Sequence, residues 1–122
     1  MQLSWDLCKI FDEVPINVSA TCVRVATERA HAMAITVETR TAVRASAVRA
    51  LLSAAQGLKV LDDPNMEVYP MAMTATGQME VHVGRIRQSL VFEEKGIDLF
   101  VCGDQLLRGG ALDGVKSLTE FF

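Results

Sequence analysis

The sequence predicts an α+β domain, in which helices cover one face of a mixed, mainly antiparallel sheet. Short stretches of alternating apolar and polar residues, typical of half-buried strands, recur between residues 16 and 103. Two longer stretches, residues 45–56 and 105–121, carry apolar residues at helical spacing. The length of 122 residues fits a single domain, residues 1–122, with one core.

The N-terminal third is expected to hold one helix and two strands. Residues 3–12 suit a short helix capped by Ser4. Residues 16–24 alternate as in a half-buried strand, with apolar positions at Val18, Ala20 and Cys22. A polar bend follows, and a second strand-like stretch, HAMAITVE, begins at His31.

The middle of the chain predicts an amphipathic helix followed by a short strand. In residues 45–56 the apolar side chains fall on one helical face, which leaves Arg49 and Gln56 on the outside. Gly57 is well placed to end this helix, because glycine is favoured just after a helix C-terminus. Residues 58–61, LKVL, then form a short buried strand.

A turn and a further strand are expected next. Asp62-Asp63-Pro64-Asn65 has the composition of a turn. Residues 80–87, EVHVGRIR, alternate as a strand in which Gly84 marks a bulge. His82 on this strand is expected to face outward as a polar residue rather than to bind a ligand.

The C-terminal part predicts a turn, a strand and a helix. Residues 93–96 form the turn that leads into the strand IDLFVCG. Asp104 can cap the final helix, residues 105–121, although Gly109 and Gly110 weaken its first part.

Composition and charge exclude several classes of function. The net charge is −3 and the basic residues are scattered, so no nucleic-acid partner is expected. No apolar stretch approaches the roughly 20 residues of a membrane span, and the N-terminus does not read as a signal peptide. Three widely spaced cysteines argue against a disulfide framework, so a cytoplasmic location is expected.

The sequence also predicts neither a metal site nor a nucleotide-binding loop. The two histidines are far apart and no Cys-x-x-Cys pair occurs, so metal ligation is not expected. No GxGxxG motif is present.

Arg24 and His31 are the candidates for chemistry. They lie seven residues apart, on either side of the bend between the two expected strands, and can converge on one small anion. A guanidinium holds a carboxylate by two parallel hydrogen bonds, and an imidazole transfers protons near neutral pH. The alternative is that Arg24 is a solvated strand end, or is paired with Glu28 or Glu38, and that His31 is an ordinary loop histidine.

Four sequence blocks resemble bacterial aspartate-semialdehyde dehydrogenases, in the same order and from about Lys9 onward. The blocks are VPINVSATCVRVATERAHAMAITVE, LLSAAQGLKVLDDP, EVHVGRIRQSL and DLFVCGDQLLRGGALDGV. The family consists of NADP-dependent oxidoreductases of amino-acid biosynthesis. In it the arginine of CVRV binds the substrate carboxylate, and the histidine of GHS is the acid–base catalyst. The resemblance therefore implies these roles for Arg24 and His31.

The resemblance is to the substrate-and-dimerisation domain alone. The family's cysteine nucleophile belongs to an S-N-C-type motif, which does not occur in these 122 residues. Cys22 is an unfavoured substitute, because the expected strand would bury its thiol. The chain also departs from the family pattern: Ala30 replaces a glycine, Ala26 a proline and Ala32 a serine. Asp113 replaces an asparagine near the nicotinamide, which disfavours cofactor binding through the last helix.

Three functions are consistent with these observations. The first is a dimerisation and substrate-binding module that forms a homodimer, binds a small carboxylate, needs no cofactor and has no redox activity alone. The second is a stand-alone enzyme that acts on a small carboxylate through Arg24 and His31 without a nicotinamide. The third is one half of a split NADP-dependent dehydrogenase.

Overall fold

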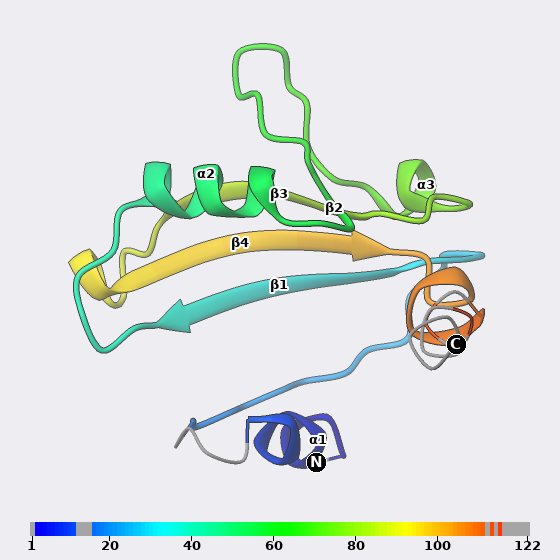
Figure 1. The fold of residues 1–122 in the computed structure, drawn as a ribbon, viewed down its shortest axis with the longest axis horizontal. Coiled ribbons are helices and arrows are strands. Elements are labelled where there is room, and N and C mark those ends of the chain that lie inside the picture. Colours follow the sequence, from blue (N-terminus) through cyan, green and yellow to red (C-terminus); the bar gives the residue numbers. More distant parts are fainter. Residues whose placement is uncertain (1, 12–15, 112, 114, 116–122) are drawn as a thin grey trace.

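The computed structural model describes residues 2–11, 16–111, 113 and 115, and the α+β prediction is confirmed (Figure 1). Two short helical turns, η1 (Glu93–Lys95) and the π-helical η2 (Leu107–Ala111), accompany the regular elements. The helices and strands are, in chain order, α1 (Gln2–Ile10), β1 (His31–Glu38), α2 (Ala45–Ala54), β2 (Leu58–Val60), α3 (Ala72–Ala75), β3 (Val81–Gln88) and β4 (Gly96–Gly103).

The four strands form one mixed sheet in the order β1-β4-β3-β2. The β1–β4 and β4–β3 pairs are antiparallel and the β3–β2 pair is parallel, as the mainly antiparallel prediction requires. At one end of the sheet His31 pairs with Gly103, and at the other Glu38 pairs with Gly96. The pairing of β3 with β4 is interrupted after Gly84, so the predicted bulge is confirmed.

The main core lies between α2 and one face of the sheet. Val83, Ile86 and Ile97 are buried there, and Val48 and Leu52 of α2 pack against them. An isolated helix of ten residues is marginal in water, so this apolar contact is what stabilises α2.

A second, smaller cluster lies on the opposite face of the sheet. Neighbouring residues of a strand point to opposite faces, so Cys102 points away from the face on which its neighbour Val101 packs against the α2 core. There Cys102 packs with Ala75 of α3 and with Ala30, while Phe100 lines the edge of the cluster. A helix of four residues gives too short a period to be detected in the sequence, and α3 was not predicted.

The expected first strand, residues 16–24, does not form. Residues 16–30 pair with no strand and run beside β1, with α1 on their far side (Figure 1). Ala20 and Cys22 are exposed, so the burial expected for the Cys22 thiol is wrong. Alternation indicates which residues could share one side of a strand, but a strand forms only beside a partner, and no other described segment pairs with these residues.

The C-terminal helix starts where it was predicted, beyond the end of β4 (Figure 1). The side chain of Asp104 accepts the N–H of Leu106 at 3.1 Å, so the predicted cap is confirmed. Residues 112, 114 and 116–122 lie outside the described part of the chain, and with them most of the expected helix 105–121. Among the described helices, none has both the length and the apolar character of a membrane span.

Arg49 is not the free surface residue that the helical pattern predicted. Its guanidinium bonds the carboxylate of Asp62, and its Nη2 also donates to the carbonyl of Ile86 at 3.2 Å. The Asp62 side chain is only 5% exposed and accepts the N–H groups of Arg85 at 2.8 Å and Ile86 at 3.2 Å. Because Arg85 has φ of +56°, Asp62 holds the bulge of β3 in a conformation that ordinary residues disfavour.

Candidate functional site

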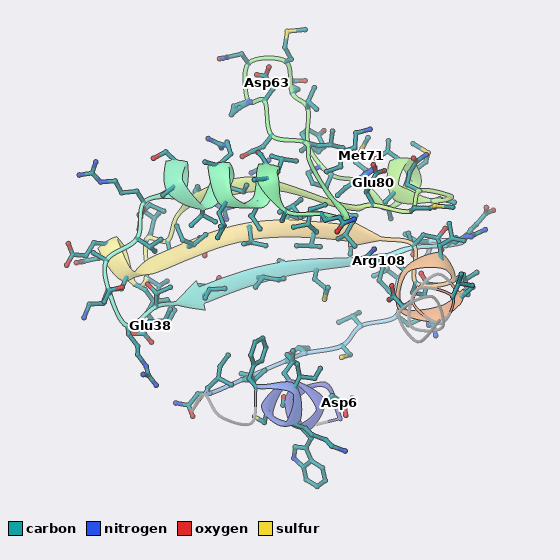
Figure 2. All side chains as sticks on the ribbon, in the orientation of Figure 1. Asp6, Glu38, Asp63, Met71, Glu80 and Arg108 are labelled. Carbon is teal, nitrogen blue, oxygen red and sulfur yellow. The ribbon has the colours of Figure 1, made fainter. Side chains whose placement is uncertain are left out.

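Arg24 and His31 are both exposed at the entrance to β1. His31 is the first residue of the strand and Arg24 lies in the unpaired segment before it. Among the described residues Arg24 makes no hydrogen bond or ion pair, so its guanidinium is open to a ligand. The alternative, an ion pair of Arg24 with Glu28 or Glu38, is therefore not observed in the part of the chain that the structure describes. Glu38 lies at the far end of β1 (Figure 2).

The bend before His31 contains one strained and one buried feature. Ala30 is 6% exposed and has φ of +72°, in the left-handed region that favours glycine. The preceding residue, Arg29, extends its guanidinium inward, and its Nε lies 2.7 Å from the carboxylate Oδ2 of Asp104. The bend is thus anchored from its inner side.

Asp104 joins three segments through a carboxylate that is fully buried. Besides its ion pair with Arg29, it accepts the backbone N–H of Gly77 at 2.7 Å and that of Leu106 at 3.1 Å. Burial raises the pKa of Asp104. The Gly77 N–H, the Arg29 guanidinium and the Leu106 N–H lower the pKa by more than burial raises it, so the net pKa lies below the ordinary value. The carboxylate therefore stays charged and bonded.

His82 is buried, so the expectation that it faces outward is wrong. It is 2% exposed and lies opposite Cys102, on the face of the sheet that α3 covers. Neither ring nitrogen has a hydrogen-bond partner among the described residues. Burial and then nearby Lys59 lower the pKa of His82, and Glu80 opposes this only in part. Alternation along β3 marks His82 as opposite in direction to Val81 and Val83, but does not show that this second face is covered.

A shallow groove of about 480 Å³ crosses the face of the sheet opposite α2. One wall is β1 and β4, and the other is the segment that leads into α3, where Met71 is visible (Figure 2). Two arginines, Arg85 and Arg87, are among its lining residues. The groove is lined by Ala32, Ala34, Tyr69, Pro70, Met71, Ala72, Arg85, Arg87, Leu99 and Phe100. Such an open, largely apolar surface suits contact with protein better than enclosure of a small molecule.

Residues 1–108 match the family model of the semialdehyde dehydrogenase dimerisation domain. The chain belongs to this family. The Synechocystis aspartate-semialdehyde dehydrogenase is 40% identical over 116 residues, which are 95% of this chain and 34% of that protein. The Aquifex aeolicus aspartate-semialdehyde dehydrogenase is 36% identical over 115 residues, 94% of this chain and 34% of that protein. The chain therefore spans about a third of the length of these relatives.

Solved structures agree with the family assignment. The crystal structure of aspartate semialdehyde dehydrogenase II from Vibrio cholerae, complexed with ASA, superposes with a TM-score of 0.85 at 33% identity. The match includes 94% of this chain and 33% of the Vibrio cholerae chain. The structure of aspartate semialdehyde dehydrogenase from Francisella tularensis superposes with a TM-score of 0.81 at 30% identity. The match includes 96% of this chain and 34% of the Francisella tularensis chain.

Within this dimerisation domain, sequence reasoning missed the buried partner of the bend before His31. Asp104 was predicted as a helix cap, which it is, but its contacts with Arg29 and Gly77 join residues far apart in the chain. No local pattern predicts such a contact. The described residues contain no group of three or more His, Cys, Asp or Glu side chains that could hold a metal ion.

Proposed function

We propose that the chain is a dimerisation and substrate-binding module of the semialdehyde dehydrogenase type, in which Arg24 binds a substrate carboxylate and His31 transfers the proton. The observation that carries the proposal is the exposed guanidinium of Arg24, which has no hydrogen-bond or ion-pair partner among the described residues, in a domain whose family is established. An arginine kept for stability would be expected to hold a protein carboxylate, as Arg29 and Arg49 do.

The chemistry follows from these two side chains. The guanidinium fork offers two parallel N–H donors, which bind and orient one carboxylate. His31 is exposed at the first position of β1, so its ring can reach a molecule held beside the strand end. Affinity rests on one arginine open to water, so binding in the millimolar range is expected.

Titration with succinate, a small dicarboxylate, tests the binding site. Nitrogen-15 NMR of the purified chain is expected to show shifts of the His31 ring signals as succinate is added, and Arg24→Gln is expected to remove them. Arg44→Gln is the matched control, because Arg44 is also exposed and lacks a side-chain partner among the described residues. The proposal fails if Arg24→Gln leaves the response intact, or if both substitutions reduce it equally.

We further propose that a second copy of the chain covers the groove face. The family is a dimerisation domain, and the small side chains of Ala32 and Ala34 are exposed along β1 on this face. Ala34→Arg, which places a charge in the groove, is expected to convert a dimer to monomers in light scattering at micromolar concentration. Ala47→Arg is the control, because Ala47 is exposed on α2, which packs on the other face. A wild-type mass equal to one chain contradicts this proposal.

These 122 residues are not expected to carry out the NADP-dependent reaction alone, because they contain neither the nucleophile motif nor a GxGxxG loop. NADP reduction with aspartate semialdehyde by the purified chain, abolished by Cys22→Ser, would overturn this expectation and identify Cys22 as the nucleophile. Cys22 is a suitable target because its thiol is free and exposed. The cytoplasm is the proposed location, since the cysteines of the described residues are unpaired.

A partnership with a nucleotide-binding chain is the second candidate. Trp5, Ile10 and Val23 are each more than 70% exposed, on α1 and on the segment that follows it. Apolar side chains this exposed on neighbouring segments are expected where a protein partner covers them. Mixing the chain with the nucleotide-binding part of the Synechocystis relative tests this. NADP reduction by the mixture supports the partnership, provided that Trp5→Ser lowers the rate of reduction. No reduction at high protein concentration argues against the partnership.

A further inference from the structure

We propose that Asp104 is a positioning residue for His31 and acts on it through Arg29. This inference rests on the proposed function, because it gives a role to the residues that hold the acid–base histidine. Among the described residues no hydrogen bond or ion pair joins the Asp104 side chain to His31 or Arg24. It acts on the backbone that carries His31.

The contact closes the end of the β1–β4 pair. His31 is the first residue of β1 and pairs with Gly103, the last residue of β4. Arg29 precedes His31 by two residues, and Asp104 follows Gly103 by one. The ion pair of Arg29 and Asp104, at 2.7 Å, therefore joins the segments next to β1 and β4 just beyond the last residue pair of the two strands. Strand ends open easily, and an ion pair at that point, in which the Asp104 carboxylate is buried, keeps His31 in register.

The bend needs such a contact because its own backbone is unfavourable. Ala30 lies between Arg29 and His31 with φ of +72°, where a residue with a Cβ is disfavoured. Ala30 is nevertheless buried, packed with Ala75 and Cys102. The ion pair on one side of Ala30 and the strand pairing on the other keep it in this conformation.

The remaining bonds of Asp104 connect His31 to two further elements. The Gly77 N–H donates from the turn after α3, and the Leu106 N–H from the residue before η2. The backbone carbonyl of Asp104 also accepts the N–H groups of Leu107 at 3.1 Å and Arg108 at 2.8 Å. A displacement of η2 would therefore move the same residue that holds the bend before His31.

The experiment measures the His31 ring by nitrogen-15 NMR in the full chain, with succinate as the probe. Asp104→Asn keeps the shape of the side chain but replaces one acceptor oxygen with a donor nitrogen and removes the charge. Asp62→Asn is the matched control. Asp62 is also a nearly buried carboxylate that pairs with an arginine and accepts two backbone N–H groups, but it holds the bulge of β3.

Asp104→Asn is expected to shift the His31 ring signals and to reduce the change that succinate produces in them, because the ring no longer lies beside the anion that Arg24 holds. Asp62→Asn is expected to leave both readouts unchanged at a temperature where both variants are folded. Unchanged His31 signals in Asp104→Asn, or equal effects of the two substitutions, overturn the proposal.

Arg29 provides the second test, because its side chain is 37% exposed and can be replaced without creating a cavity. Arg29→Gln is expected to reproduce the effect of Asp104→Asn, and Arg29→Lys, which keeps the charge, to restore most of the wild-type behaviour. If Arg29→Gln has no effect, the proposal is wrong even where Asp104→Asn fails to fold. If succinate does not change the spectrum of the wild-type chain, the proposed function fails. The His31 ring signals of the variants without succinate still test whether Asp104 and Arg29 position His31.

Discussion

Replacing Asp62 with alanine should destabilise the domain far more than replacing its neighbour Asp63, although both belong to one predicted turn. The Asp62 carboxylate is nearly buried and bonds the N–H groups of Arg85 and Ile86 as well as the Arg49 guanidinium. Asp63 stands on the loop that projects from the sheet (Figure 2), where its carboxylate accepts the N–H groups of Asn65 and Met66 in its own turn.

The size of the effect follows from what each donor can do without the carboxylate. Ile86 is 4% exposed, so its N–H would lose its acceptor in a dry site, at a cost of about 2 kcal/mol. The N–H of exposed Arg85 and the 40% exposed guanidinium of Arg49 can turn to water, so their loss adds only about 1 kcal/mol. Asp62→Ala should therefore lower the free energy of unfolding by about 3 kcal/mol, and the melting temperature by roughly 10–15 °C.

Thermal and urea unfolding followed by circular dichroism, at one fixed protein concentration, measures this difference. Asp63→Ala should cost less than about 1 kcal/mol, because the bonds it removes lie in an exposed turn. Hydrogen exchange adds a local readout, since the Ile86 amide should lose protection in Asp62→Ala and retain it in Asp63→Ala. Equal costs for the two substitutions, or an Asp62→Ala cost below about 1 kcal/mol, would refute the reasoning.

Two further substitutions test the packing of the sheet. A Cβ on Gly84 would lie 2.0 Å from the Leu61 carbonyl oxygen, so Gly84→Ala should lower the free energy of unfolding by about 3 kcal/mol. Gly103→Ala is the control: its Cβ would lie 3.4 Å from Val81, so it should cost less than about 1 kcal/mol. Because burial and Lys59 lower the pKa of His82 below 6.5, the unfolded chain binds that proton first, and stability present above pH 6.5 is lost as pH falls through the folded-state pKa. His82→Leu should flatten this loss below about pH 6.5, and an unchanged slope of melting temperature against pH would exclude His82 as its source.

The elements that were predicted correctly are those whose signal is local. The helix 45–56 and the strands around residues 58–60, 81–88 and 96–103 were found with small errors in their ends. Helical spacing and alternation lie within a few residues, and the core confirms their apolar sides. The bulge at Gly84 was likewise predicted from one glycine inside an alternating stretch, and the family from the order of four sequence blocks.

The errors share one physical cause. Residues 16–24 have the pattern of a strand but no partner beside them, and His82 has the position of an outward residue on a face that α3 covers. The roles of Arg24 and His31 stay predictions, because they depend on a bound ligand. Asp62 and Asp63 are the same residue type in the same turn, yet only Asp62 meets Arg49 and the bulge of β3.

The sequence by itself determined which side of α2, β2, β3 and β4 is apolar and which family the chain resembles. The tertiary structure alone decided what faces each polar group, including the pairing of Arg29 with Asp104 across 75 residues of chain. The reason is that burial and hydrogen bonding depend on residues brought together by the fold, whereas periodicity records only the preferences of a segment for one side.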